Sequence, residues 1–342
     1  MPSSTTSPSA TDMSFASGME QAWYRGASWL WLLRPLEIPF RSIAATRRWL
    51  YASGRCDSYR APVPVVVVGN ITVGGTGKTP VVIALVEALQ AAGLRPGVIS
   101  RGYGASVGGF PRELSANSRA SEVGDEPLLI YQRTGAPCVV DPQRARAAQS
   151  LLARHPVDIL ISDDGLQHYA LARDFEIALL DQQRGIGNGF CLPAGPLREP
   201  PSRLDSVDCL LYRGGEGEHD SVRYQPTALV DVVSGKSLPF DKQQFGASVL
   251  AVTGIGQPEQ FFASLRAAGF KAQEQVFPDH YAYTKVDIEA FGDGPVIITE
   301  KDAVKCRTLL TPRDVGRLWY LRIDAVLPAV LIERVTALVK PA

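Results

Sequence analysis

Residues 65–80 read VVVVGNITVGGTGKTP, four valines followed by a glycine-rich loop that ends in lysine and threonine. The apolar run predicts a buried strand over Val63–Val68, and the pattern after the loop predicts a helix from about Lys78 to Ala92. A strand that passes through a glycine loop into a helix is typical of phosphate binding, because loop N–H groups and the helix N-terminus face the anion. This stretch therefore predicts an α/β fold built around an anion-binding loop.

The loop is a variant of the nucleotide-binding P-loop pattern. In that pattern a lysine reaches the β and γ phosphates and the next hydroxyl ligates Mg²⁺, which here are Lys78 and Thr79. The strict pattern has a glycine five positions before Gly77, where this chain has Thr72. The alternative is a strand–helix turn that is rich in glycine by chance. The residues expected to hold ATP are Gly74, Gly75, Thr76, Gly77, Lys78 and Thr79.

Strands and helices alternate after Arg60, which predicts a doubly wound, mostly parallel sheet. The expected strands are Val98–Ser100, Cys138–Val140, Val157–Ser162 and Phe175–Leu180, with helices at Glu126–Thr134 and Pro142–Arg154. Residues 213–246 are polar and glycine-rich, and we expect an interdomain joint there. A second unit follows, with strands at Ser248–Thr253 and Pro295–Thr299 and a helix at Pro258–Ala268. The expected division is an unstructured tail at 1–18, an N-terminal membrane-interface helical segment at 19–55, a P-loop domain at 56–225 and a smaller α/β domain at 226–342.

The composition excludes several classes of protein. The 342 residues are 45% apolar and 20% charged with a formal net charge of zero, which indicates no nucleic-acid partner. The five cysteines are scattered and there are only four histidines, so we expect no zinc site, no disulfide framework and a reducing compartment. Residues 1–18 lack the basic and apolar regions of a signal peptide, and the chain has no segment suited to crossing a bilayer.

The first 50 residues suggest contact with a membrane surface. Four of the five tryptophans lie there among arginines, and no lysine precedes Lys78, which is typical of an interfacial helix. Leu36, Phe40, Ile43 and Leu50 follow helical spacing, and Pro39 marks either the start of a helix or a kink. The alternative is an amphipathic helix that packs on the protein's own core.

Acidic residues provide the candidates for catalysis. Asp163 and Asp164 follow the apolar segment Val157–Ile161, where buried carboxylates need a cation or donors, and we expect a metal ligand there. The alternative is that both cap the following turn. Asp125, by its position before a proline at a helix start, is typical of helix capping. His280, beside Asp279, is a candidate to orient a catalytic base.

One motif imitates a guanine-binding signature. Thr284-Lys285-Val286-Asp287 matches TKxD, but a threonine followed three residues later by an acid also marks a helix start. We predict a helix cap here and no guanine specificity.

Eight segments together resemble the tetraacyldisaccharide 4'-kinase family of lipid A synthesis. They extend from about residue 20 to residue 305 and occur in the family's order: PVPVVVVGNITVGGTGKTP, VISRGYG, VGDEPLLI, ISDDGLQH, LPAGPLREP, VTGIGQPEQFF, FPDHYAYT and TEKDAVK. The resemblance implies transfer of the ATP γ-phosphoryl group, with Mg²⁺, to the 4'-hydroxyl of a tetraacylated glucosamine disaccharide 1-phosphate. It also implies a peripheral enzyme on the cytoplasmic face of the bacterial inner membrane, in contact with anionic lipid and without an obligate protein partner.

The resemblance also implies roles for individual residues. Asp125 becomes the general base and His280 its supporting partner, which replaces the capping interpretation of Asp125. The implied catalytic residues are Asp125, His280, Lys78 and Asp164; the implied metal ligands are Thr79, Asp163 and Asp164; the implied substrate contacts are Arg101, Tyr103, Arg198 and Glu199.

Two other functions fit parts of the pattern. A membrane-cycling P-loop switch ATPase of the partitioning type also carries GGxGKT, but it has a signature lysine where this chain has Val73. A lipid-binding module with a degenerate nucleotide site is the other alternative, and the intact Lys78, Thr79 and paired aspartates disfavour it.

Overall fold

The larger unit is built on a mostly parallel sheet. The computed structural model describes residues 10–105, 108–215, 217, 220–245 and 248–339. The strands of this unit are β1 (Val65–Gly69), β2 (Pro96–Ser100), β3 (Arg112–Glu113), β4 (Cys138–Val140), β5 (Ile159–Asp163), β6 (Phe175–Asp181) and β7 (Cys209–Arg213). Its helices are α3 (Lys78–Ala91), α4 (Ala120–Val123), α5 (Asp125–Thr134), α6 (Arg144–Leu152) and the 3-10 helix η2 (Pro201–Ser206). Every strand predicted here is present, with ends within two residues.

Side chains of β1 explain why helices cover both faces of this sheet. Val66 and Val68 pack with α3 and α5 in one apolar cluster, whereas Val65 and Val67 pack with α6 in another. Alternate residues of a strand point to opposite faces, so four consecutive valines fill both clusters. The doubly wound α/β fold predicted from the sequence is confirmed.

The smaller unit continues the same sheet. Its strands are β8 (Ser221–Asp231), β9 (Ser237–Pro239), β10 (Ser248–Thr253), β11 (Lys271–Val276), β12 (Val296–Thr299) and β13 (Leu318–Val326). Its helices are α7 (Pro258–Ala267), α8 (Lys285–Ala290) and α9 (Glu300–Cys306), with 3-10 helices η3 (Lys242–Gln244), η4 (Arg307–Leu309) and η5 (Pro312–Asp314), and α10 (Ala329–Thr336) follows β13. The described strands have the order β11-β10-β12-β13-β8-β7-β6-β1-β5-β2-β4-β3, and β9 pairs with β8.

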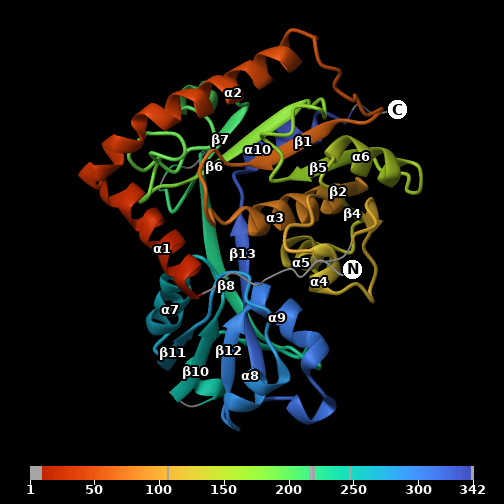
Figure 1. Cartoon of the computed structure of the whole chain (residues 1–342). Coiled ribbons are helices and arrows are strands. Elements are labelled where there is room, and N and C mark those ends of the chain that lie inside the picture. The colour runs from red at the N-terminus through yellow and green to blue at the C-terminus, as the bar shows by residue number, and fades with distance from the viewer. Residues whose placement is uncertain (1–9, 106–107, 216, 218–219, 246–247, 340–342) are drawn as a thin grey trace, which may run out of the picture.

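Two long antiparallel strands, β8 and β13, join the units (Figure 1). All of β8 lies within residues 213–246, where the sequence shows only weak strand alternation. Its pairing with β13 shifts register between Arg322, which lies opposite Ala228, and Ile323, which lies opposite Pro226. Proline cannot donate to a ladder and is tolerated beside such an irregularity, which explains the weak pattern.

The C-terminal helix returns to the larger unit. Leu331 and Val335 of α10 are buried in the apolar cluster formed by β1, α3 and α5. The predicted division at residue 226 places this helix in the smaller domain, and that division stays a prediction.

The N-terminal segment forms α1 (Ala10–Arg25), the 3-10 helix η1 (Ser28–Leu33) and α2 (Arg34–Ala52), which run along the outside of the larger unit (Figure 1). Helix α1 begins inside the predicted unstructured tail, of which residues 1–9 lie outside the described residues. Pro39 lies inside α2, and Pro35 stands in its first turn. Among the described residues, no helix combines the length and the apolar character that crossing a bilayer requires.

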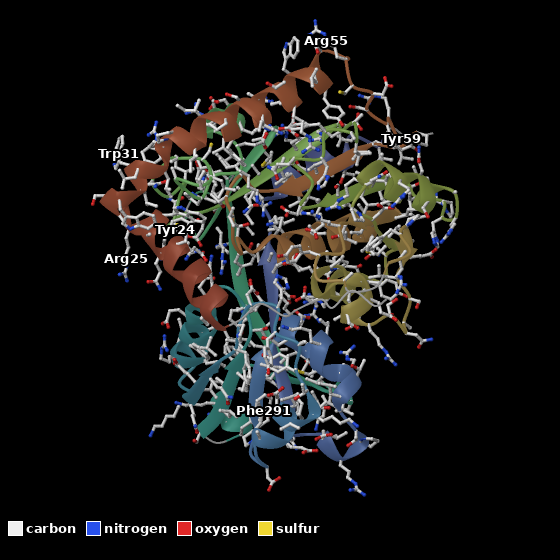
Figure 2. All side chains as sticks on the ribbon, viewed as in Figure 1. Tyr24, Arg25, Trp31, Arg55, Tyr59 and Phe291 are labelled. Carbon is white, nitrogen blue, oxygen red and sulfur yellow. The ribbon has the colours of Figure 1, made fainter. Side chains whose placement is uncertain are left out.

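Helix α2 has one face on the protein and one in solvent. Glu37 is buried and Phe40 packs against the second apolar cluster, whereas Leu36 and Ile43 are exposed. Exposed Trp31 lies on the outer side of this N-terminal segment in Figure 2. The predicted stripe therefore does not fit either interpretation alone, since its members divide between the core and the surface.

Candidate active site

The glycine loop connects β1 to α3 as predicted. Gly74 and Gly77 have positive φ angles of 106° and 82°, which glycine adopts without strain. Lys78 begins α3 and extends its amine to Asn70 Oδ1 at 3.2 Å and to Asp164 Oδ1 at 3.4 Å. Thr79 follows in the first turn of α3. The loop therefore presents its lysine beside the carboxyl end of the neighbouring strand β5.

Thr72, the departure from the strict pattern, is buried. Its hydroxyl accepts a hydrogen bond of 3.1 Å from Asn70 Nδ2, and its backbone pairs with Leu197. The hydroxyl therefore bonds within the loop, and the backbone holds the loop against residues 196–198.

The two predicted metal-side carboxylates differ in environment. Asp163 lies opposite Val68 of β1 and is buried; its Oδ2 accepts from Ser100 Oγ at 3.1 Å, while its Oδ1 has no hydrogen-bond partner among the described residues. Burial, and then the charges of Glu126 and Asp164, raise the pKa of Asp163 to about 7. An added cation at the free oxygen would relieve this cost.

Asp164 is already paired. It adopts a positive φ of 47° and contacts both Lys78 and Arg198 Nη1, the latter at 3.0 Å. Burial alone would raise the pKa of Asp164, but Lys78 and Arg198 lower it to about 2. Asp164 is therefore ionised at neutral pH and holds the P-loop lysine.

The donor set suits magnesium in the presence of phosphates. No group of three or more His, Cys, Asp or Glu side chains is arranged to hold a metal ion in the part of the chain that the structure describes. Mg²⁺ usually takes one or two protein carboxylates and completes its shell with phosphate oxygens and water. Two carboxylates, one with a free buried oxygen, fit that requirement.

Asp125 and His280 meet across the two units. Asp125 is the first residue of α5, and its Oδ2 lies 3.0 Å from Nδ1 of His280, in the loop between β11 and α8. Its Oδ1 accepts from the N–H of Glu126 at 2.9 Å, so Asp125 also bonds within the first turn of its helix. Asp125 and His280 are therefore in contact, although 155 residues separate them.

Asp125 and His280 shift each other's pKa in opposite directions. Burial would raise the pKa of Asp125, but the His280 hydrogen bond and the charge of Lys301 lower it below its usual value. The hydrogen bond that His280 donates to Asp125 raises the pKa of His280, against the opposing effects of burial and Lys301. An ionised Asp125 is thus held at neutral pH within reach of a proton-carrying imidazole.

The loop after β2 brings Tyr103, from the segment VISRGYG, next to the Asp125–His280 pair. The ring of Tyr103 lies 5.2 Å from that of His280 and is exposed. A Cβ at Gly124 would lie 2.6 Å from the carbonyl oxygen of Tyr103, so only glycine allows α5 to start against this loop. After burial, the charge of Glu126, the residue that follows Asp125, raises the pKa of Asp163. This effect links the Asp125–His280 pair to the P-loop side of the site.

The remaining predicted substrate contacts have different surroundings. Arg198 pairs with Asp164, as described above. Glu199 is buried and accepts from Gln167 Nε2 at 2.8 Å and from Tyr169 Oη, which directs its carboxylate into the protein. Arg101 is exposed. Burial, and then the charges of Arg144 and Arg101, lower the pKa of His168 to about 3.

Several residues at the site were not predicted. Lys301 lies 3.1 Å from Glu126 Oε1, and Gln257 Nε2 donates to the Gly75 carbonyl at 2.6 Å. Tyr224 Oη donates to the Gly77 carbonyl, also at 2.6 Å. The motifs TEKDAVK and VTGIGQPEQFF contain Lys301 and Gln257, and these motifs were the signal from which both residues could have been found.

The TKVD motif has the predicted structural role. Thr284 Oγ1 accepts from the Asp287 N–H at 3.3 Å, and Asp287 Oδ2 accepts from the Thr284 N–H at 2.8 Å. These reciprocal bonds form the capping box of α8, so the helix-cap prediction is confirmed.

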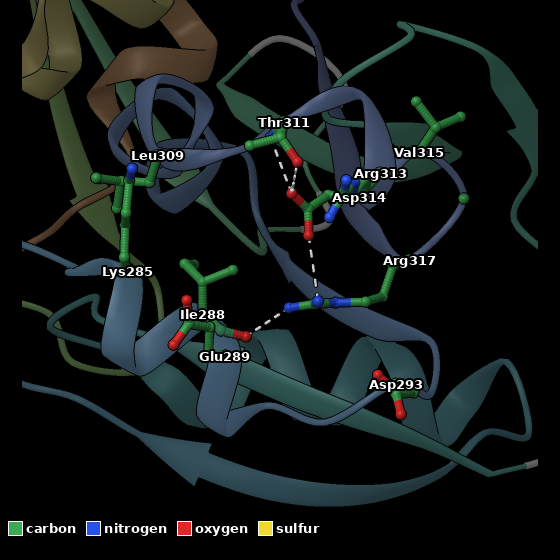
Figure 3. Close-up of a pocket in the computed structure, with 11 residues that line it drawn as sticks. Lys285, Ile288, Glu289, Asp293, Leu309, Thr311, Arg313, Asp314, Val315 and Arg317 are labelled. Atoms are coloured by element: carbon green, nitrogen blue, oxygen red, sulfur yellow. Dashed lines mark hydrogen bonds and ion pairs between the residues drawn. The ribbon is translucent and has the colours of Figure 1, made fainter.

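A hollow of about 630 Å³ lies elsewhere in the smaller unit (Figure 3). Lys285, Arg313 and Arg317 line it together with acidic residues, and Arg317 is already bonded to Asp314 at 3.1 Å. None of the predicted site residues lines it. We therefore place the chemistry at the P-loop and the Asp125 pair.

Comparisons with known proteins show which family the chain resembles. The family model for "Tetraacyldisaccharide-1-P 4'-kinase" matches residues 29–340 of the chain. Proteins named tetraacyldisaccharide 4'-kinase from Pseudomonas aeruginosa (strain LESB58) and Azotobacter vinelandii are each 50% identical to it over 317 residues, covering 92% of this chain and 94% of theirs. The crystal structure of LpxK from Aquifex aeolicus in complex with ATP matches with a TM-score of 0.76 and 27% identity, covering 91% of this chain and 99% of that chain.

Proposed function

Because the chain belongs to the tetraacyldisaccharide 4'-kinase family, we propose that it transfers the γ-phosphoryl group of ATP to the 4'-hydroxyl of a tetraacylated glucosamine disaccharide 1-phosphate, with Asp125 as the general base. Family membership makes the chain a kinase of lipid A biosynthesis, and it does not favour the partitioning-type switch ATPase. The observation that best supports Asp125 as the base is its 3.0 Å contact with His280.

The P-loop side binds the phosphoryl donor. Backbone N–H groups of residues 74–79 cradle the triphosphate, and Lys78 moves from Asp164 and Asn70 to the β and γ phosphates. Thr79, Asp163 and Asp164 are the residues that would hold Mg²⁺, which neutralises phosphate charge when bound. The free Oδ1 of buried Asp163 supports this assignment.

The Asp125 side prepares the acceptor. As the 4'-oxygen forms its bond to the γ phosphorus and the bond to the ADP oxygen breaks, the hydroxyl proton passes to Asp125. His280 donates to Asp125 Oδ2 and fixes the orientation of the carboxylate. Because the transition state of phosphoryl transfer is loose, alignment of the hydroxyl and stabilisation of charge contribute most of the rate.

Substrate contacts follow from the surroundings. Arg101 and Arg198 place positive charge near a substrate that carries a phosphate, and exposed Tyr103 offers a ring surface beside His280 for a sugar. Glu199 acts through its network with Gln167 and Tyr169, which holds the backbone next to Arg198.

The enzyme binds its lipid substrate at the membrane surface. Exposing an acyl chain to water costs about 0.8 kcal/mol per CH₂, so a substrate with four chains stays in the bilayer. Trp29, Trp31 and Leu32 are 46%, 64% and 80% exposed, and arginines flank them. This exposed apolar segment supports peripheral binding to anionic lipid on the cytoplasmic face of the inner membrane.

The test combines product analysis with two variants. Mass spectrometry of lipid A disaccharide incubated with enzyme, ATP and Mg²⁺ is expected to show one added phosphate. Asp125→Asn should lower kcat about 10²- to 10⁴-fold and leave ATP affinity near normal, because a general base acts on the acceptor. Lys78→Ala should reduce both ATP affinity and rate, because the lysine contacts the phosphates before and during transfer.

Two results would contradict this assignment. An Asp125→Asn enzyme with wild-type kcat would exclude Asp125 as the base, and a parallel loss of ATP affinity would assign Asp125 to the metal side. ATP hydrolysis that is independent of the disaccharide would support the switch ATPase instead.

A further inference from the structure

Lys301 lies at the meeting point of the two units. It is the second residue of α9 in the smaller unit, and its amine lies 3.1 Å from Glu126 Oε1 and 3.9 Å from Asp125 Oδ2, both on α5 of the larger unit. The amine is also 3.9 Å from Asp279 Oδ1. The lysine therefore contacts three carboxylates, of which only Asp279 belongs to its own unit.

The contacts of Lys301 and His280 close a ring. The oxygen of Asp125 that lies nearest Lys301, Oδ2, is also the one that contacts His280 Nδ1 at 3.0 Å. The oxygen of Asp279 nearest Lys301, Oδ1, lies 4.0 Å from His280 Nε2. Two cation-forming groups thus share the same two acidic oxygens, and a shift of Lys301 changes the surroundings of both His280 and Asp125.

The charge balance at Asp125 depends on this lysine. The Asp125 side chain is only 6% exposed, and the carboxylates of Glu126 and Asp279 lie in the same cluster. The positive groups that face it are His280 and Lys301, together with Lys305, whose amine lies 2.7 Å from Asp302. Burial and like charges oppose ionisation of a carboxyl group, so the nearby ammonium is needed to keep a proton acceptor in place.

We propose that Lys301 is a positioning residue for the phosphoryl transfer: from the smaller unit, its ammonium keeps Asp125 ionised and aligned with His280. This inference rests on the proposed role of Asp125 as general base. It implies that the base is complete only when α9 and α5 are in contact. The lowered pKa of Asp125, to which the charge of Lys301 contributes, agrees with this role.

Two substitutions separate charge from packing. Lys301→Met keeps the length of the apolar stem and removes the charge, whereas Lys301→Arg keeps the charge. The matched control is Lys271→Ala, which replaces an exposed lysine at the start of β11. For each variant we would measure kcat, KM for the disaccharide, ATP affinity, thermal unfolding and the pH dependence of kcat.

The expected pattern is specific to a role in catalysis. Lys301→Met should lower kcat about 10- to 100-fold with ATP affinity unchanged, and the acid limb of the pH profile should move upward by about one unit. The direction follows because loss of a cation disfavours the charged carboxylate, so a higher pH is needed to ionise it. Lys301→Arg should keep the acid limb in place and retain most of kcat, and Lys271→Ala should behave as wild type.

Other outcomes overturn the proposal. If Lys301→Met has wild-type kcat and an unshifted acid limb while Asp125→Asn is inactive, the role of Lys301 fails and that of Asp125 stands. If the Met and Arg variants lose equal activity without a shift of the limb, Lys301 contributes packing only. If Asp125→Asn itself keeps its activity, the proposed base is wrong and this inference falls with it.

Discussion

Two side chains of the candidate site depend on backbone conformations that their residue types rarely adopt. Asp164 and His280 are the non-glycine residues with positive φ in the described part of the chain, at 47° and 59°. Such conformations cost about 1–3 kcal/mol each and persist only where surrounding contacts impose them. Here the contacts are those of Asp164 with Lys78 and Arg198, and of His280 with Asp125. These backbone conformations direct both side chains into the site.

The Asp125–His280 contact should make stability depend on pH. The folded protein raises the pKa of His280, so this contribution is full below about pH 6.5, the unfolded value, and is lost as pH rises through the folded value. The folded protein lowers the pKa of Asp125, so its contribution is present above about pH 3.9 and is lost as pH falls further.

We therefore expect His280→Gln to destabilise the protein by about 1.5 kcal/mol at pH 5.5 and by less at pH 9. Urea unfolding of both proteins at the two pH values measures this. An equal difference at both values would contradict a charged hydrogen bond.

At the scale of elements, helix α2 divides its residues between two environments. Its buried face carries Glu37, which contacts Arg34 at 2.8 Å and accepts from the Cys191 N–H at 3.0 Å. Its other face, with η1 before it, exposes apolar side chains. Attachment to the protein through one face leaves the second free for lipid.

The triple substitution of Trp29, Trp31 and Leu32 by Ser should move the protein away from membranes. Removal of three large apolar side chains from a lipid interface should weaken binding to anionic vesicles at least about tenfold, without loss of nucleotide affinity. Vesicle sedimentation measures the change. Val276, Val286 and Val315 are also more than half exposed, but lie in the smaller unit, and their triple replacement by Ser is the matched control. Equal sedimentation of all three proteins would refute the membrane-binding role.

At the scale of the molecule, an ion cluster joins the units at the end of α5 opposite the proposed base. Arg133 at the end of α5 is 8% exposed, and its guanidinium contacts Glu300 of α9 at 3.0 Å and Asp324 of β13 at 2.5 Å. Removal of the cation would leave Glu300, whose pKa is already raised by burial, without its main partner.

Arg133→Met should lower the free energy of unfolding by about 3 kcal/mol, because it leaves the largely buried carboxylate of Glu300 unpaired. The control is Arg307→Ala, which removes an exposed contact of 2.9 Å between η4, the turn that follows α9, and Gln132 of α5, and should cost less than about 0.5 kcal/mol. Urea unfolding compares them. Equal effects would show that burial of the Arg133 cluster contributes nothing specific.

The sequence by itself determined the P-loop, strands β1, β2, β4, β5 and β6 of the larger unit and the identity of the site motifs, because these depend on local patterns. Four valines form a strand that is buried on both faces, and glycines allow the loop to turn wherever it lies in the fold. The cap of α8 by Thr284 and Asp287 is equally local. The family motifs added Asp125 and His280, for which the local pattern alone favoured a helix cap and an isolated histidine.

Only the tertiary structure decided which side chains meet. Asp125 and His280 are 155 residues apart, and Lys301 reaches Asp125 and Asp279 from a third segment. The long strands β8 and β13 were missed because Pro226 and polar residues weaken the alternation, and pairing across the sheet stabilises them instead. Contacts between distant segments arise from the packing of the two units, which no local pattern of residues encodes.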